Sequence, residues 1–180
     1  MLQITIPAKE LWDEAKEEFI STKEQTLQLE HSLISLSKWE SKWHKPFLSN
    51  DIKTEEETLD YIRCMTITQN VDPMVYKFIP INIREEIVEY INAPMTATWF
   101  NNEKHGKSSS EQTTSELIYY WMIAQNIPFE CEKWHLNRLL TLIKVCNIKN
   151  QPPRKMGKKA RMSQQAALNA ARRKQFNTRG

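Results

Sequence analysis

Glycine is scarce in this chain of 180 residues, which contains only Gly106, Gly157 and Gly180. Loops that cradle a phosphate need several glycines, because the backbone must approach the anion closely. The sequence therefore argues against a P-loop or a Rossmann nucleotide site. It also disfavours all-β folds, which are rich in tight turns.

Paired cysteines and long apolar runs are also lacking. Cys64, Cys131 and Cys146 are odd in number and far apart, and no CxxC pair occurs. The first residues lack the charged region and apolar run of a signal peptide. No apolar stretch approaches the roughly 18 residues that span a bilayer. We therefore expect a soluble protein of a reducing cytosol, with free thiols and no membrane partner.

Acidic residues are missing from the end of the chain. Residues 151–180 contain nine Lys and Arg and no Asp or Glu, whereas residues 1–150 contain sixteen Lys and Arg and all 22 Asp and Glu. The first segment thus has a net charge of −6 and the second one of +9. This separation predicts an acidic body, residues 1–150, and a basic tail, residues 151–180, that is flexible or ordered by a partner.

The predicted fold class is mainly α, with a small antiparallel β element at the N-terminus. Residues 2–6 and 24–30 alternate apolar and polar side chains, and Pro7 ends the first run. This pattern predicts a β-hairpin within residues 1–30. A two-stranded hairpin is marginal alone, so we expect it to pack on the helices.

Helical periodicity with capping residues follows the hairpin. Ser32 is expected to cap a helix that Pro46 closes, and Thr54 with Glu57 forms the capping box of the next helix. Asp72 is expected to start a short helical turn.

Further helices are predicted in the second half of the body. Asn82 is expected to cap a helix, and the polar residues 101–110 look like a flexible loop. Residues 113–125 predict a strongly apolar helix. Residues 133–150 predict a central helix with a wide apolar face. Beyond Pro153, an alanine-rich segment favours a fluctuating or partner-induced helix.

Patterns for catalysis or metal binding are weak. Cys131 and His135 are four residues apart, but no second pair of zinc ligands follows the same spacing, so a buried thiol and a hydrogen-bonded imidazole are favoured. Cys64 and Cys146 lie on apolar helix faces, which favours packing over nucleophilic chemistry. The run of glutamates at 55–57 is explained by helix capping. We expect no catalytic residue, no metal and no cofactor, and the chain is not predicted to be an enzyme.

Tryptophan is abundant, with six residues. Trp39 and Trp43 are four residues apart on one helical face, and Trp134 opens the last helix of the body. Two hypotheses remain open for these three residues. They either pack in the core, which is favoured for Trp39 and Trp43, or they form a partner-binding patch, because aromatic residues are enriched at interface hot spots.

The basic tail supplies the remaining candidate partner-binding residues. These are Arg154, Lys155, Lys158, Lys159, Arg161, Arg172, Arg173 and Lys174. The tail is a solvated end, a nucleic-acid-binding element, or an arm that docks on an acidic protein surface, including that of a neighbouring subunit. Phe176 is its only aromatic residue, which gives weak support for base stacking.

Three stretches are familiar as a set. They are LEHSLISLSKWESKWHKPFL (29–48), SELIYYWMIAQNIPFECEKWHLNRLLTLIKVCNIKN (115–150) and ALNAARRKQFNTRG (167–180). Together they resemble proteins of tailed bacteriophages and prophages, in particular the siphophage tail assembly chaperones. The resemblance covers nearly the whole chain, but it includes no residue whose role is transferable.

The resemblance implies a mostly helical, non-enzymatic assembly factor that can form homo-oligomers. Its expected partner is the tape measure protein or the tail tube protein during tail morphogenesis in the host cytoplasm. Two alternatives remain open. The first is a structural component of the virion, such as a head–tail connector or tail-tip protein. The second is a small nucleic-acid-binding protein that acts through its basic tail.

Overall fold

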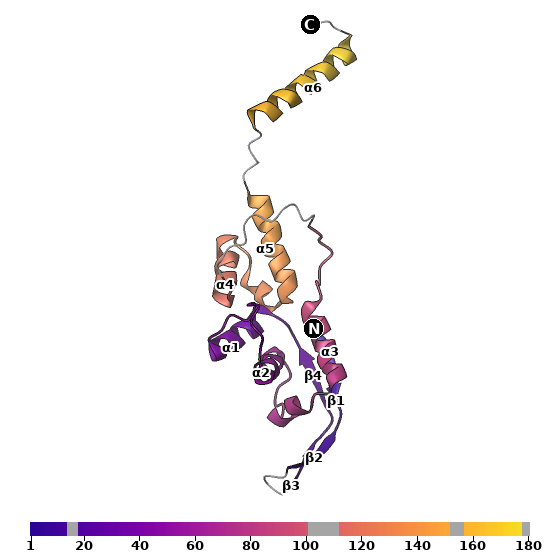
Figure 1. The fold of residues 1–180 in the computed structure, drawn as a ribbon, viewed down its shortest axis with the longest axis vertical. Coiled ribbons are helices and arrows are strands. Elements are labelled where there is room, and N and C mark those ends of the chain that lie inside the picture. Colours follow the sequence, from indigo (N-terminus) through magenta and orange to yellow (C-terminus); the bar gives the residue numbers. More distant parts are fainter. Residues whose placement is uncertain (14–17, 101–111, 152–156, 178–180) are drawn as a thin grey trace. The chain divides into compact units, whose positions relative to one another are not determined.

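The chain is mainly helical, as the sequence predicts. The computed structural model describes residues 1–13, 18–100, 112–151 and 157–177 (Figure 1). The chain divides into two units, residues 1–146 and residues 147–180. The two units are described separately below as unit 1 and unit 2. The predicted loop at 101–110 lies outside the described residues.

Unit 1 begins with a long antiparallel hairpin. Strand β1 (Leu2–Ile6) pairs with β4 (Gln25–Leu29), which confirms the predicted β element. Two further strands, β2 (Lys9–Asp13) and β3 (Glu18–Thr22), continue the pairing in the same register beyond Pro7. The sequence did not predict β2 and β3, because no apolar alternation marks them.

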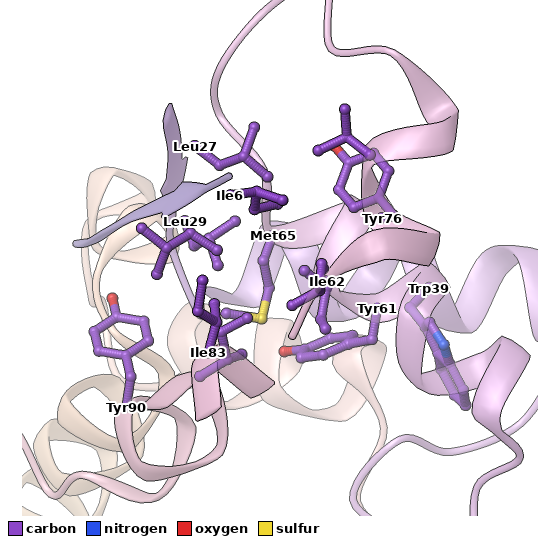
Figure 2. Packing of buried hydrophobic residues seen from close by; sticks show 14 residues of the cluster. Ile6, Leu27, Leu29, Trp39, Tyr61, Ile62, Met65, Tyr76, Ile83 and Tyr90 are labelled. Carbon is purple, nitrogen blue, oxygen red and sulfur yellow. The ribbon is translucent and has the colours of Figure 1, made fainter. Parts of the chain in front are cut away.

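The hairpin packs on helices through one face, as expected. Ile4, Ile6, Leu27 and Leu29 alternate with exposed or half-buried neighbours and are all buried. Figure 2 shows three of them against side chains of the helices that follow. The first cluster of unit 1 also contains Trp39, Tyr61, Ile62, Met65, Val75, Tyr76, Ile79, Ile83, Ile87 and Tyr90. Burial of this face therefore stabilises a hairpin that would be marginal alone.

Local capping begins the first helices of unit 1. Helix α1 (Leu33–Trp43) starts at Ser32, whose side chain accepts from the Ser35 N–H. Helix α2 (Glu55–Met65) starts with the predicted Thr54–Glu57 capping box. The 3₁₀ helix η1 (Pro73–Phe78) starts at Asp72, whose carboxylate accepts from the Met74 N–H. These three predicted caps are confirmed.

The predicted cap at Asn82 is wrong. Helix α3 (Ile81–Asn92) starts two residues earlier than this cap predicts, with Pro80 as its N-cap and no side-chain cap. Pro80 has the extended backbone that an N-cap needs, and its carbonyl accepts the first helical hydrogen bond from Arg84, at 3.0 Å. Asn82 is therefore an exposed residue inside the first turn.

A second buried cluster lies under the remaining helices of unit 1. It joins Leu33 and Leu36 of α1 to α4 (Ser115–Ala124), η2 (Phe129–Lys133) and α5 (Leu136–Asn150). Leu136, Leu139 and Ile143 bury one face of α5, and other apolar residues on this helix are half-buried. The wide apolar face predicted for this helix is confirmed.

Unit 2 contains helix α6 (Lys158–Phe176), which ends at Asn177 in the left-handed conformation. Every side chain described in α6, from Arg161 onward, is exposed. Unit 2 by itself therefore offers α6 no hydrophobic core.

Candidate protein-binding surfaces

Trp39 belongs to the core of unit 1. Its side chain is 1% exposed, and the indole Nε1 donates a hydrogen bond to the carbonyl of Glu57 at 2.8 Å. The ring of Phe47 meets it edge to face, with centroids 5.1 Å apart. The partner-binding hypothesis is therefore wrong for Trp39, and the core-packing alternative is confirmed.

Trp43 is half-buried one helical turn further along α1. Its Nε1 donates to the Asp60 carboxylate at 2.9 Å, and Lys42 pairs with the same carboxylate. The Lys42 ammonium also lies 5.4 Å from the centre of the Trp43 ring. Most of this indole is thus held by contacts within unit 1, which leaves only part of it available to a partner.

Trp134 is also half-buried, at the junction of η2 and α5. Its ring packs against the second cluster, and the guanidinium of Arg138 lies 4.2 Å from the ring centre. A cation over an aromatic face is a favourable contact that holds both side chains in place. The three predicted tryptophans therefore do not form one exposed patch.

Trp99 is a strongly exposed tryptophan that the sequence analysis did not single out. It is 86% exposed, immediately before Phe100, whose ring lies 4.1 Å from the Lys144 ammonium. The residues around it follow neither helical nor strand periodicity, so no pattern placed it on a buried face. The lack of periodicity around Trp99 is the one feature of the sequence that could have indicated an exposed indole.

Helix α4 and the following η2 present exposed apolar side chains, which we call the α4 face and define as Tyr120 and Ile123 of α4 and Phe129 of η2. These side chains are 63%, 61% and 54% exposed. Glu116 is the only charged residue of α4. A helix that is apolar all round is normally covered by other elements. Since α4 buries Ile118 and Met122 and leaves the opposite side exposed, no described element of unit 1 covers the α4 face.

Tyr119 supports the α4 face from its side. Its hydroxyl donates to the Glu132 carboxylate at 2.9 Å, and its ring centroid is 6.3 Å from that of Phe129. Burial and the neighbouring carboxylate raise the pKa of Tyr119 to about 12. The contact fixes η2, and with it Phe129, against α4. The side chains of the α4 face therefore belong to two elements, α4 and η2, that are held together by these contacts.

An apolar groove lies between α2 and α3, and we call it the α2–α3 groove. Its volume is about 270 Å³. Leu59, Val88 and Ile91 line it, and the buried Ile62 and Ile87 contribute to it from below. Arg84 and Glu55 form an ion pair at 2.9 Å beside it. Lys53 also lines the groove, with its ammonium 4.7 Å from the centre of the Phe47 ring. The groove is therefore mostly apolar, and its charged lining residues are the Arg84–Glu55 ion pair and Lys53.

An acidic surface of α3 adjoins this groove. Glu85, Glu86 and Glu89 are exposed, and none of them has an ion-pair partner among the described residues. Ile81 and Val88 are exposed on the same helix. The outer side of α3 thus combines unpaired carboxylates with exposed apolar side chains.

The predicted basic residues fall into three groups. Arg154 and Lys155 lie outside the described residues, and Lys158 and Lys159 are in the first turn of α6. The others, Arg161, Arg172, Arg173 and Lys174, are exposed on α6. These cations are therefore available to an anionic partner.

The thiols of Cys64 and Cys131 are poor nucleophiles. Burial raises the pKa of Cys64 and of Cys131, which lowers the thiolate fraction near neutral pH. Among the described residues, no group of three or more His, Cys, Asp or Glu side chains is placed to hold a metal ion. No helix in the described part of the chain is long and apolar enough to cross a membrane.

Comparison of the chain with family models, with curated proteins and with solved structures gave no match.

Proposed function

We propose that this chain is a phage tail assembly chaperone that binds the tape measure protein, the tail tube protein or both during tail morphogenesis in the host cytoplasm. The α4 face carries the proposal. Tape measure proteins, as the resemblance implies, are long and helical, and an amphipathic helix binds by laying its apolar side against an apolar surface. A folded, charged unit with one such surface would hold such a client in solution.

The size and make-up of the α4 face agree with this role. Large exposed apolar patches on otherwise polar proteins mark interaction sites. Tyrosine is enriched at binding hot spots, since it combines a large contact area with a polar group. The acidic surface of unit 1 would also keep a complex with an apolar client soluble.

The test is co-expression of this chain with a tape measure protein. We expect the full chain to keep the client soluble and to be retained with it on an affinity column. Tyr120→Ser combined with Ile123→Ser should reduce retention about tenfold or more, because two central apolar contacts are lost. Ile52→Ser is the matched control, since Ile52 is 98% exposed and lies outside the α4 face.

Two results would overturn the proposal. One is equal retention of the client by the α4 double variant and the wild type. The other is the presence of this chain in stoichiometric amounts in purified complete virions, which would favour a structural component such as a head–tail connector or tail-tip protein.

A second candidate function is nucleic-acid binding through α6. It is favoured by the exposed cations of this helix, with no acidic residue in the tail to oppose them. Each phosphate that such a helix neutralises makes the affinity more salt-dependent. If this function is correct, DNA affinity falls steeply with salt and is lost when residues 151–180 are deleted.

A further inference from the structure

Helix α6 has a stripe in which arginine and apolar residues share one side. Arg161, Leu168, Arg172 and Phe176 follow each other at spacings of seven, four and four residues. Residues at these spacings lie on one face of a helix. All four side chains are exposed, and we call them the α6 stripe. An exposed leucine and phenylalanine flanked by arginines are typical of a helix that binds an apolar, acidic surface.

Helix α3 carries the complementary arrangement. Ile81, Glu85 and Val88 are at spacings of four and three residues, so they form a stripe along one exposed side of α3, which we call the α3 stripe. Val88 also lines the α2–α3 groove, where its neighbours are Leu59 and Ile91. The α3 stripe therefore places a carboxylate beside an apolar groove, as the α6 stripe places guanidinium groups beside apolar side chains.

We infer that the α2–α3 groove with the α3 stripe is the docking site for α6 of a second copy of this chain. Leu168 and Phe176 enter the groove beside Val88, and Arg172, which lies between them on the α6 stripe, pairs with Glu85. Charge complementarity identifies the occupant, because the acidic residues all lie in residues 1–150 and α6 contains none. All residues that line the α2–α3 groove belong to unit 1, and the whole α6 stripe belongs to unit 2.

The nearby charges favour this occupant over an acidic or neutral helix. The one cation of α3, Arg84, is already paired with Glu55, and its Nε also donates to the carbonyl of Ile79 at 3.1 Å. Glu85 and Glu89 therefore face an incoming arginine without a competing cation on their own helix. Pairs at the border of an apolar contact fix its register and exclude partners of the wrong charge.

Docking of this kind joins two different surfaces. Such a contact is heterologous, so it either closes by mutual exchange of α6 between two copies or continues head to tail. The inference goes beyond client binding, which uses the α4 face. Self-association is measured without any client, so its failure and the failure of the proposed function are distinguishable.

The experiment is sedimentation velocity on the full chain over a range of concentrations at low and moderate salt. We expect reversible association that weakens with salt. Arg172→Glu and Glu85→Lys should each weaken the association about tenfold, because each places like charges opposite one another. The double variant with both changes should recover most of the loss, since the pair is restored with its signs exchanged.

Two matched controls separate docking from general charge effects. Lys174→Glu makes the same change of charge as Arg172→Glu, but position 174 points away from the α6 stripe. Glu86→Lys likewise makes the same change of charge as Glu85→Lys, at a position outside the α3 stripe. Both controls should leave association within about twofold of wild type. Thermal unfolding of each variant identifies any that fails to fold. Leu168→Ala, at an exposed position, is then a second test of whether the α6 stripe is needed for self-association.

Mixing distinguishes contact between copies from contact within one chain. A chain carrying Glu85→Lys still has an intact α6, and a chain carrying Arg172→Glu still has an intact α3 stripe. Together they should form a two-chain complex at concentrations at which each variant alone stays mainly monomeric. The inference is overturned if the full chain stays monomeric at all concentrations, if the controls weaken association as much as the stripe variants, or if mixing restores nothing.

Discussion

The imidazole rings of His31 and His135 meet edge to face inside unit 1, with their centroids 5.0 Å apart. Both side chains are buried. The Nδ1 of His31 is 2.6 Å from the Tyr61 hydroxyl, and the Nε2 of His135 donates to the Tyr90 carbonyl at 3.0 Å. Burial, and then the neighbouring His135, lowers the pKa of His31 to about 3, and burial also lowers the pKa of His135.

Unit 1 should therefore lose stability in mild acid. The unfolded chain protonates His31 near its ordinary pKa of 6.5, whereas the folded chain keeps it neutral until about pH 3. The stabilising contribution is complete above pH 6.5 and is lost as the pH falls, by about 1.4 kcal/mol per pH unit for this group. Urea unfolding at pH 7, 6 and 5 measures the slope. His31→Gln should make it shallower, whereas His44→Asn, at an exposed position, should leave it unchanged. An unchanged slope in His31→Gln would contradict the prediction.

Glu40 should be a major stabilising residue of unit 1. Its buried carboxylate accepts from the Phe47 N–H at 2.8 Å and from the Ser115 N–H, at the start of α4, at 2.7 Å. Glu40→Ala leaves both donors without this acceptor and should cost about 3 kcal/mol in the free energy of unfolding. Glu40→Gln keeps one acceptor oxygen and should cost less. Glu86→Ala, on an exposed position, should change stability by less than about 0.5 kcal/mol. Equal effects of Glu40→Ala and Glu86→Ala in denaturant titrations would show that the carboxylate is dispensable.

The capping box of α2 predicts a smaller effect. Thr54 Oγ1 accepts from the Glu57 N–H at 3.2 Å, and Glu57 accepts in return from the Thr54 N–H at 2.8 Å. Thr54→Ala should lower the free energy of unfolding by about 1 kcal/mol, because one N–H loses its partner. Thr54→Ser keeps the hydroxyl and is the matched control. A Thr54→Ser variant as unstable as Thr54→Ala would assign the loss to the methyl group instead.

Leu27 tests whether the hairpin depends on the helices. Its side chain is fully buried in the first cluster, so Leu27→Ala should cost about 3 kcal/mol through lost apolar burial and the cavity that remains. Chemical denaturation measures the loss. Ile52→Ala removes a similar side chain from an exposed position and should cost less than about 0.5 kcal/mol. A small effect at Leu27 would mean that the hairpin contributes little to the fold.

Features set by neighbours in sequence were predictable. The caps at Ser32, Thr54 and Asp72 each depend on a side chain and a backbone group two or three residues apart. The error at Asn82 has the same local character. The prediction chose Asn82 because its side chain is a good N-cap, whereas the helix begins after Pro80 through the backbone of that residue alone.

Features set by packing were not predictable. Trp39 and Trp43 occupy one face of α1, yet α2 buries Trp39 and leaves Trp43 half-buried. The sequence of α4 shows that it is apolar all round, but only the positions of α1, η2 and α5 determine that Tyr120 and Ile123 stay exposed. The candidate α4 face therefore required the structure, whereas the cations of α6 could be read from the charges alone.

Phe47 connects the two buried clusters of unit 1. Its ring stacks on Tyr61 in the first cluster, with centroids 3.8 Å apart, and it also packs against the second cluster. Its N–H is held by Glu40, the same carboxylate that begins α4. Neither cluster can open without disturbing the other at this residue. Residues 1–146 should therefore melt together, with no stable half for proteases to attack separately.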